Sequence, residues 1–326
     1  YIWEYISSVA SITGVVSLPQ ETFQPSTHTK TSVLFLKKTT EKPKSIFMAI
    51  ANRVGHNKNG KPVYKVDKSS NVKVLDDDLP IIAKKFNSYT NNNKFPADHL
   101  GFSISYDKVN DHIFIPEYYN PEIRQELEAL KKSGQYLLLS IGDLINKRIL
   151  QVSRGNEIGS QFYGTGEIPF VRTSDIVNWE IKFDPVKAVS EDVYNKYKKA
   201  QDIQENDILF VNDGTFLIGR TAMVTKLDLK IIIQSHIRKI RVLDKEFINP
   251  FYLFYLLNSK IVRKQIDSKT FVQATISTIG NRLREIVLPI NKDQNEVKKI
   301  IREIKDIIEK KADLRDKTVK IVEASI

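Results

Sequence analysis

The amino-acid sequence predicts a mixed α/β protein built from more than one domain. Three observations support this prediction. The chain has 326 residues, and domains of about 100–200 residues imply two or three of them. Short apolar runs bounded by Gly, Pro and Asn recur along most of the chain, as in strands separated by turns. Near the C-terminus aliphatic residues recur every three or four positions, which is typical of an amphipathic helix.

The first 116 residues combine helix and strand patterns and form the first predicted domain. Residues 1–6 predict an amphipathic helix already under way, so we expect the chain to be part of a longer protein. A helix is predicted from Asp76–Asp78 and Pro80, because acids suit the positive end of a helix and proline suits its first turn. Strands are predicted at 15–19, 31–36 and 45–50 and around Phe102 and Ile113. The runs at 31–36 and 45–50 are too apolar to face water on one side.

A helix that begins at Asn120-Pro121 and ends at Ser133-Gly134 marks the predicted linker, residues 117–136. Residues 137–294 carry short strand patterns with frequent Gly and polar turns and form the second predicted domain. Helices are expected near 193–199 and from Asn249-Pro250 through residue 257. The second of these is apolar on all sides, so we expect it to be buried.

Residues 295–326 predict a single long helix, longer than is usual in a globular protein. Such a helix needs a packing partner. The aliphatic residues expected to form its packing seam are Val297, Ile300, Ile301, Ile304, Ile307 and Ile308. A plain surface helix is the alternative.

Composition excludes several classes of protein. The absence of cysteine excludes disulfide frameworks, thiolate zinc sites and thiol nucleophiles. No apolar run is long enough to cross a membrane and no signal peptide is recognisable, so we expect a cytoplasmic protein with no membrane partner. The net charge is +11, spread as +5 over residues 1–116, +4 over 117–295 and +2 over 296–326. This excess suits phosphate binding, although an AT-rich coding sequence that favours Lys codons would also produce it.

Familiar enzyme motifs are absent from the sequence. The five histidines share no metal-ligand spacing, and no glycine-rich phosphate loop occurs. Asn249-Pro250-Phe251-Tyr252 differs by one residue from the Asn/Asp-Pro-Pro-Tyr/Phe turn with which amino-methyltransferases hold their target amine. It lacks the second proline and is better explained as a helix start. We therefore predict no catalytic, cofactor or metal site in this chain.

A series of segments in the first 90 residues resembles the late part of an N6-adenine DNA methyltransferase. The segments are Ser17–Phe23, Thr29–Lys38, Phe47–Ile50, Gly55–Lys61 and Asp77–Ile82. More specifically they resemble the catalytic subunits of type I restriction-modification systems and their single-chain relatives. The resemblance implies that residues 1–116 are the last strands of a Rossmann-like methyltransferase domain. The parent enzyme would flip an adenine out of the duplex and methylate its N6 from S-adenosylmethionine. This chain lacks the cofactor loop and the catalytic turn, so we expect it to be inactive alone.

The rest of the chain, 137–326, resembles the type I specificity subunits. The matching segments are Gly166–Ile176, Asn206–Leu209, Asp213–Thr215, Ile218–Arg220, Gln234–His236, Tyr252–Ser259, Thr275–Ser277 and Leu288–Ile290. The resemblance implies an α+β target recognition domain that binds double-stranded DNA, followed by a coiled-coil-type spacer helix. A complete specificity subunit carries two such domains and two helices, and this chain has one of each. The helix is therefore expected to dimerise with another copy or to join a specificity or methyltransferase subunit.

Candidate DNA-binding residues follow from what base readout requires. Paired donors and acceptors on loops or strand edges can read bases, and arginine can contact guanine or phosphate. The candidates are Lys147, Arg148, Arg154, Arg172, Thr173, Asn212, Arg220, Gln234, His236, Arg238, Gln273, Thr275, Asn281 and Arg282. Lys147, Arg148 and Arg154 could bind phosphate or be merely solvated, and Arg220 could be structural. Asp175 is expected to cap or orient the chain, and Asp213-Gly214-Thr215 to form a turn.

The function predicted from these patterns is sequence-specific binding of duplex DNA within an adenine-specific restriction-modification enzyme. Two alternatives remain. The chain could be an assembly module that docks subunits without contacting bases, or an enzyme with an unrecognised site. A steep loss of DNA affinity with rising salt favours the first function over the docking module. Tight binding of S-adenosylmethionine would favour an enzyme.

Overall fold

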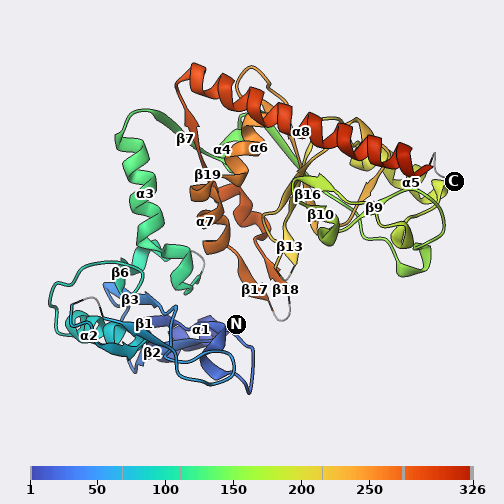
Figure 1. Ribbon diagram of the computed structural model, residues 1–326. Helices are drawn as coiled ribbons and strands as arrows, with labels where there is room; N and C mark the ends of the chain where they lie inside the picture. Colours follow the sequence, from blue (N-terminus) through green and yellow to red (C-terminus); the bar gives the residue numbers. More distant parts are fainter. Residues whose placement is uncertain (1, 68, 110–111, 215, 274–275, 324–326) are drawn as a thin grey trace. The chain divides into compact units, whose positions relative to one another are not determined.

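The computed structural model describes residues 2–67, 69–109, 112–214, 216–273 and 276–323, and the chain forms two compact units. The units are residues 1–126 and 127–326. Helix α3 (Pro121–Lys132) contains the division between them. Figure 1 follows the chain through both units.

The N-terminal unit contains a four-stranded mixed sheet in the order β2-β1-β3-β6. Strands β1 and β3 are parallel, and β2 and β6 pair antiparallel with them at the two edges. The secondary structure of this unit is α1 (Ile2–Val9), β1 (Ser11–Ser17), β2 (Ser32–Lys37), β3 (Ser45–Ile50), β4 (Tyr64–Val66), β5 (Lys73–Leu75), α2 (Leu79–Thr90) and β6 (Phe102–Ser105). Strands β4 and β5 form a separate hairpin.

Both faces of this sheet are packed, which explains why β3 is apolar from Ile46 to Ile50. Phe47 and Ala49 pack with Ile82 of α2 on one face. Ile46 and Met48 pack with Phe114 on the other. Strand β6 confirms the strand predicted around Phe102.

Two sequence predictions for this unit are wrong. Strand β2, expected to be buried like β3, is largely exposed because it lies at the edge of the sheet. Leu36, for example, is 50% exposed. Ile113 lies in a loop and not in a strand. The neighbouring Phe114 accounts for the apolar pattern there, because its side chain is buried in the core without strand pairing.

The C-terminal unit contains many short strands, as predicted from its turn-rich sequence. Its elements are β7 (Tyr136–Ser140), α4 (Ile141–Asn146), β8 (Leu150–Arg154), β9 (Phe170–Val171), β10 (Ile176–Val177), β11 (Glu180–Ile181), α5 (Glu191–Gln201), β12 (Ile208–Val211), β13 (Asp213–Gly214), β14 (Thr221–Met223), β15 (Ile232–Ile233), β16 (Ile237–Val242), α6 (Pro250–Asn258), α7 (Lys260–Ser268), β17 (Phe271–Gln273), β18 (Ile276–Thr278), β19 (Val287–Asn291) and α8 (Gln294–Glu323).

The central sheet of this unit is antiparallel, in the order β14-β12-β16-β8. A smaller sheet, β13-β18-β17, begins where β12 ends, since only Asn212 separates β12 from β13. The pairing of β7 with β19 joins the beginning of the unit to the strand that precedes α8. In Figure 1 the small sheet extends from the unit on the side away from α8.

Two buried glutamines replace missing strand partners in this unit. Gln265 of α7 donates to the carbonyl of Val287 and accepts from its amide, both at 2.8 Å. Gln201 of α5 makes the same pair of bonds with Ile233, at 2.9 and 2.8 Å. Each side chain thus satisfies a donor and an acceptor of the backbone that burial would otherwise leave unpaired.

The helices predicted from the sequence of this unit are confirmed. Asn249 caps α6 by accepting from the amide of Phe251, with Pro250 in the first turn. Most of α6 is buried, as its apolar sequence predicts. Helix α8 has 30 residues and lies along α6.

Candidate nucleic-acid interface

Five of the candidate residues lie at the same end of the central sheet. Strand register brings them together, because β12 ends and β16 begins there, with Val211 opposite Ile237. Strand β8 ends at the same place, with Arg154 opposite Arg238. Strand β14 starts there, directly after Arg220. We call Arg154, Arg220, Gln234, His236 and Arg238 the sheet-end cluster.

Two arginines of the cluster donate hydrogen bonds to the same carbonyl group. Arg154 Nε and Arg238 Nη1 both donate to the carbonyl oxygen of Ser235, at 2.9 and 3.0 Å. Burial lowers the pKa of Arg238. The negative charge of Asp213 opposes this change, and the positive charge of Arg154 adds to it. Arginine nevertheless stays charged at ordinary pH. Two neighbouring cations in a partly desolvated position favour an anionic ligand.

Asp213 links the cluster to the small sheet. Its Oδ1 accepts from Asn212 Nδ2 at 2.8 Å and from the hydroxyl of Thr278. Its Oδ2 lies 3.4 Å from His236 Nδ1. Asn212 itself is fully buried, and its Oδ1 has no hydrogen-bond partner among the described residues. In this conformation Asn212 orients Asp213 and does not present its amide to a ligand.

The next group of candidates lies in the hairpin of β17 and β18 and in the 3-10 turn Gly280–Glu285 that follows it. Arg282 lies over the ring of Phe271, 3.7 Å from its centroid, and donates to the carbonyl oxygens of Lys269 and Thr278. Asn281 is exposed beside it. Thr275 and the side chain of Gln273 lie outside what the structure describes.

Arg172 and Thr173 follow β9, which pairs parallel with β15. Arg172 is engaged by two carboxylates, with contacts of 3.1 Å to Asp175 and 2.7 Å to Asp184. Asp175 also accepts from the Arg172 amide at 2.8 Å, so the predicted capping role of Asp175 is confirmed. Arg172 therefore stabilises this turn in the structure.

Lys147 and Arg148 lie away from the sheet-end cluster. They precede β8, whose first residue, Leu150, is opposite Val242 at the far end of β16. Both side chains are exposed.

The seam predicted on the long helix is divided between two faces. Val297, Ile304 and Ile308 are buried in the C-terminal unit, whereas Ile307 is 39% exposed. Ile300 and Ile301 are partly buried. Helix α8 thus has a packing partner within its own unit, in α6 and β19.

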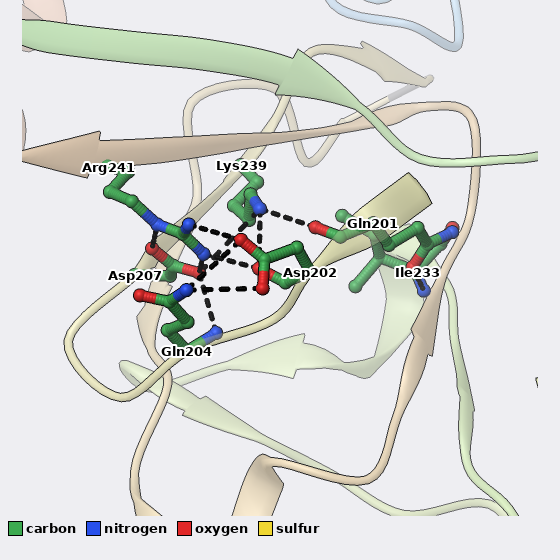
Figure 2. Close-up of polar contacts among 7 residues, drawn as sticks. All are labelled: Gln201, Asp202, Gln204, Asp207, Ile233, Lys239 and Arg241. Carbon is green, nitrogen blue, oxygen red and sulfur yellow. Dashed lines mark hydrogen bonds and ion pairs between the residues drawn. The ribbon is translucent and has the colours of Figure 1, made fainter. Parts of the chain in front are cut away.

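A buried ionic network supports strand β16, which carries Arg238 and directly follows His236 (Figure 2). Lys239, 4% exposed, donates to the backbone carbonyls of Gln201 and Asp202 at the end of α5. Arg241 holds Asp207 with two bonds of 2.7 Å. Burial lowers the pKa of Lys239, and the negative charge of Asp207 opposes that change. The network therefore fixes β16 against α5.

Sequence reasoning missed two features of this region. Asp213 was expected to form a turn with Gly214, but both residues lie in strand β13 and pair with β18, and the Asp213 side chain connects Asn212, Thr278 and His236. Phe216, in the following loop, is 85% exposed. Its signal in the sequence is an aromatic residue within a turn flanked by Gly214 and Gly219.

Residues 136–318 match the family of type I restriction modification DNA specificity domains. The chain belongs to this family. The matched segment of this specificity domain includes all of the sheet-end cluster and leaves residues 1–135 outside. No curated protein sequence matches the chain.

Solved structures similar to this specificity-domain protein include two specificity subunits. The S subunit of a type I restriction-modification system from M. genitalium is 17% identical, with 56% of this chain and 41% of that one covered and a TM-score of 0.39. The HsdS subunit from Thermoanaerobacter tengcongensis is 16% identical, with 60% and 48% covered and a TM-score of 0.34. The type IIG restriction endonuclease BpuSI is 10% identical, with 93% and 39% covered and a TM-score of 0.43. The specificity-domain chain thus spans less than half the length of each.

Among the described residues of this specificity-domain protein, no group of His, Asp and Glu could hold a metal ion. No described helix is long and apolar enough to cross a membrane.

Proposed function

We propose that this chain binds duplex DNA through the sheet-end cluster and supplies sequence specificity to a restriction-modification enzyme. The observation that carries the proposal is the position of Arg154, Arg220, Arg238, Gln234 and His236 at one end of the central sheet, within a DNA specificity domain. Arginine can neutralise phosphate or bind guanine, and Gln and His can hydrogen-bond to base edges. Such a protein acts in the cytoplasm.

The test is a salt titration of duplex binding by the full chain and by two variants. A reader of duplex DNA loses affinity steeply with salt, because each phosphate contact releases bound counterions. Arg220→Ala should reduce the slope of log K against log salt by about 1. Lys147→Ala, at the far end of the sheet, should leave the slope unchanged. Binding without salt dependence would support a docking module instead.

The proposal includes a role for the N-terminal unit as the C-terminal part of an N6-adenine methyltransferase domain, residues 1–116. Its support is the order of the resembling segments and the parallel pair β1 and β3 within a mixed sheet. The unit does not fit S-adenosylmethionine. Among the described residues neither Ser17 nor Ile50, where the parallel strands end, is followed by a glycine-rich turn into a helix. We therefore expect the parent enzyme to bind the cofactor elsewhere.

Methyl transfer distinguishes this proposal from a complete enzyme. The purified chain should transfer no labelled methyl group from S-adenosylmethionine to duplex DNA, and calorimetry should show no tight binding of the cofactor. Transfer by the chain alone would contradict the assignment of residues 1–116.

Helix α8 is proposed as the assembly element of the specificity domain. Its buried row packs on its own unit, so a partner helix would use a neighbouring row, roughly a quarter-turn around the helix, which includes Ile307 and Leu314, 39% and 64% exposed. Seven residues separate these two positions, the repeat of a coiled coil. The partner would be a second copy or another specificity or methyltransferase subunit. Sedimentation of wild type and Leu314→Glu tests this, because the charge should weaken self-association.

A further inference from the structure

The loop between β13 and β14 displays a large aromatic side chain to solvent. Phe216 is 85% exposed, the largest fraction among the large apolar side chains that the structure describes. The loop closes at its base, where the amide of Gly219 donates to the carbonyl oxygen of Val211 at 2.8 Å and the amide of Val211 donates to the carbonyl oxygen of Arg220 at 2.9 Å. Burial of an aromatic ring is favourable, so this ring adds binding energy to any ligand that covers it.

Anchors on both sides fix this loop. On the β13 side, Asp213 is held by Thr278 and Asn212. On the β14 side, Arg263 of α7 donates to the carbonyl oxygen of Ile218 at 3.3 Å. Phe216 is thus presented by a loop whose two ends are fixed, which lowers the entropy lost when a partner binds.

Strand register places β13, which precedes the loop, beside β18. Asp213 is opposite Thr278 and Gly214 is opposite Ser277. Because β13 is antiparallel to β18 and β18 is antiparallel to β17, β13 runs toward the end of the small sheet at which β17 ends and β18 begins. Strand β13 therefore leads away from Asn212 alongside β18.

The charges near Phe216 indicate what kind of partner it has. Arg220 is exposed at the foot of the loop. Arg238 and Arg154 lie at the same sheet end, on the carbonyl of Ser235. A partner must therefore offer negative charge next to an apolar surface. Duplex DNA does so, because phosphates border grooves in which base surfaces and thymine methyl groups are accessible to apolar side chains.

We infer that Phe216 is a DNA-contact residue that packs against the bases while the neighbouring arginines bind phosphate. The inference rests on the proposed function and names a contact within it. An aromatic contact with bases adds affinity but releases no counterions. Substitution of Phe216 should therefore lower affinity without changing the salt dependence, in contrast to substitution of Arg220.

The experiment uses the full chain and a labelled duplex selected by the wild type from a random-sequence pool. Phe216→Ala should weaken binding about tenfold, equivalent to about 1.4 kcal/mol. Its salt slope should equal that of the wild type between about 50 and about 200 mM salt. The matched control is Phe247→Ala. Phe247 is 40% exposed and follows the far end of β16, so its substitution should leave affinity unchanged.

The outcomes separate this inference from the proposed function. Wild-type affinity in Phe216→Ala, while the wild type binds the duplex with a steep salt dependence, would overturn the Phe216 contact alone. Failure of the wild type to bind duplex DNA would overturn the proposed function. A reduced slope in Phe216→Ala would also contradict the inference, because it would mean that phosphate contacts were lost.

Discussion

Arg315 of α8 donates from Nη2 to both carboxylate oxygens of Asp228, at 2.9 and 3.0 Å. Asp228 is 5% exposed and also accepts from the amide and hydroxyl of Thr225. The other guanidinium nitrogen, Nη1, donates to the carbonyl of Ile181 at 2.9 Å. The second half of the long helix is therefore fixed to the body of the C-terminal unit by charge, whereas its first half packs by apolar contact.

Arg315→Met should release this half of the helix. It would leave the buried carboxylate of Asp228 without its cation, and we expect a loss of about 2 kcal/mol, below the value for a fully buried pair because Arg315 is 25% exposed. Lys320→Met is the matched control on the same helix, because Lys320 also pairs with a carboxylate, Asp316, but its side chain is 71% exposed. Urea unfolding followed by circular dichroism measures both. Equal midpoints would contradict the role of Arg315.

The sequence predicts the existence and the length of helix α8 well, but it does not predict which face packs against the rest of the unit. Regular aliphatic spacing indicates which residues share a face, because the helical repeat alone determines that. It does not indicate whether the partner lies in the same unit. Val297, Ile304 and Ile308 turn out to pack within the unit, and Ile307 does not.

The candidate interface shows a similar division. Residue types suited to DNA could be selected from the sequence, but their meeting depends on strand register. Arg154 and Arg238 are opposite each other, whereas Lys147, seven positions before Arg154, lies toward the other end of the sheet. Burial also decides which side chains can reach a ligand. Asn212 is fully buried, and its amide donates to Asp213 instead.

Gln265→Leu should weaken the contact between α7 and β19. The substitution keeps the size of the side chain but leaves the amide and the carbonyl of Val287 without their partner, at a cost of about 2–4 kcal/mol. Hydrogen exchange gives a local measurement, in which the Val287 amide should exchange faster. Gln151→Leu, at an exposed position of β8, should leave this amide protected. Unchanged exchange in Gln265→Leu would show that another group satisfies Val287.

The network of Figure 2 predicts a dependence of stability on acid pH. Hydrogen bonds from Arg241 and then from Gln204 lower the pKa of Asp202 below its ordinary value of 3.8. A carboxylate with a lowered pKa contributes stability above pH 3.8, and that contribution is lost as pH falls through its folded pKa. Because Asp202 is 55% exposed, solvent screens the contribution and keeps it small.

Arg241→Met tests this network. At neutral pH we expect a loss of about 3 kcal/mol, because Asp207, 1% exposed, would lose its bidentate partner. The difference in stability between wild type and variant should shrink as pH falls below 3.8. Unfolding midpoints measured across this range check both the magnitude and the direction. A difference that grows on acidification would contradict the sign.

Gly155→Ala should disturb both the fold and the proposed interface. Gly155 lies directly after Arg154, and a methyl group on it would come within 2.3 Å of the backbone oxygens of Ile233 and Gln234. Backbone cannot rotate away as a side chain does, so the two segments must separate, at a cost of about 3 kcal/mol. Gly134→Ala is the control, because its left-handed backbone is strained by the change but nothing lies within 4 Å. Thermal unfolding should show the larger loss for Gly155→Ala. DNA affinity should fall only in that variant, because Arg154 and Gln234 would be displaced relative to each other.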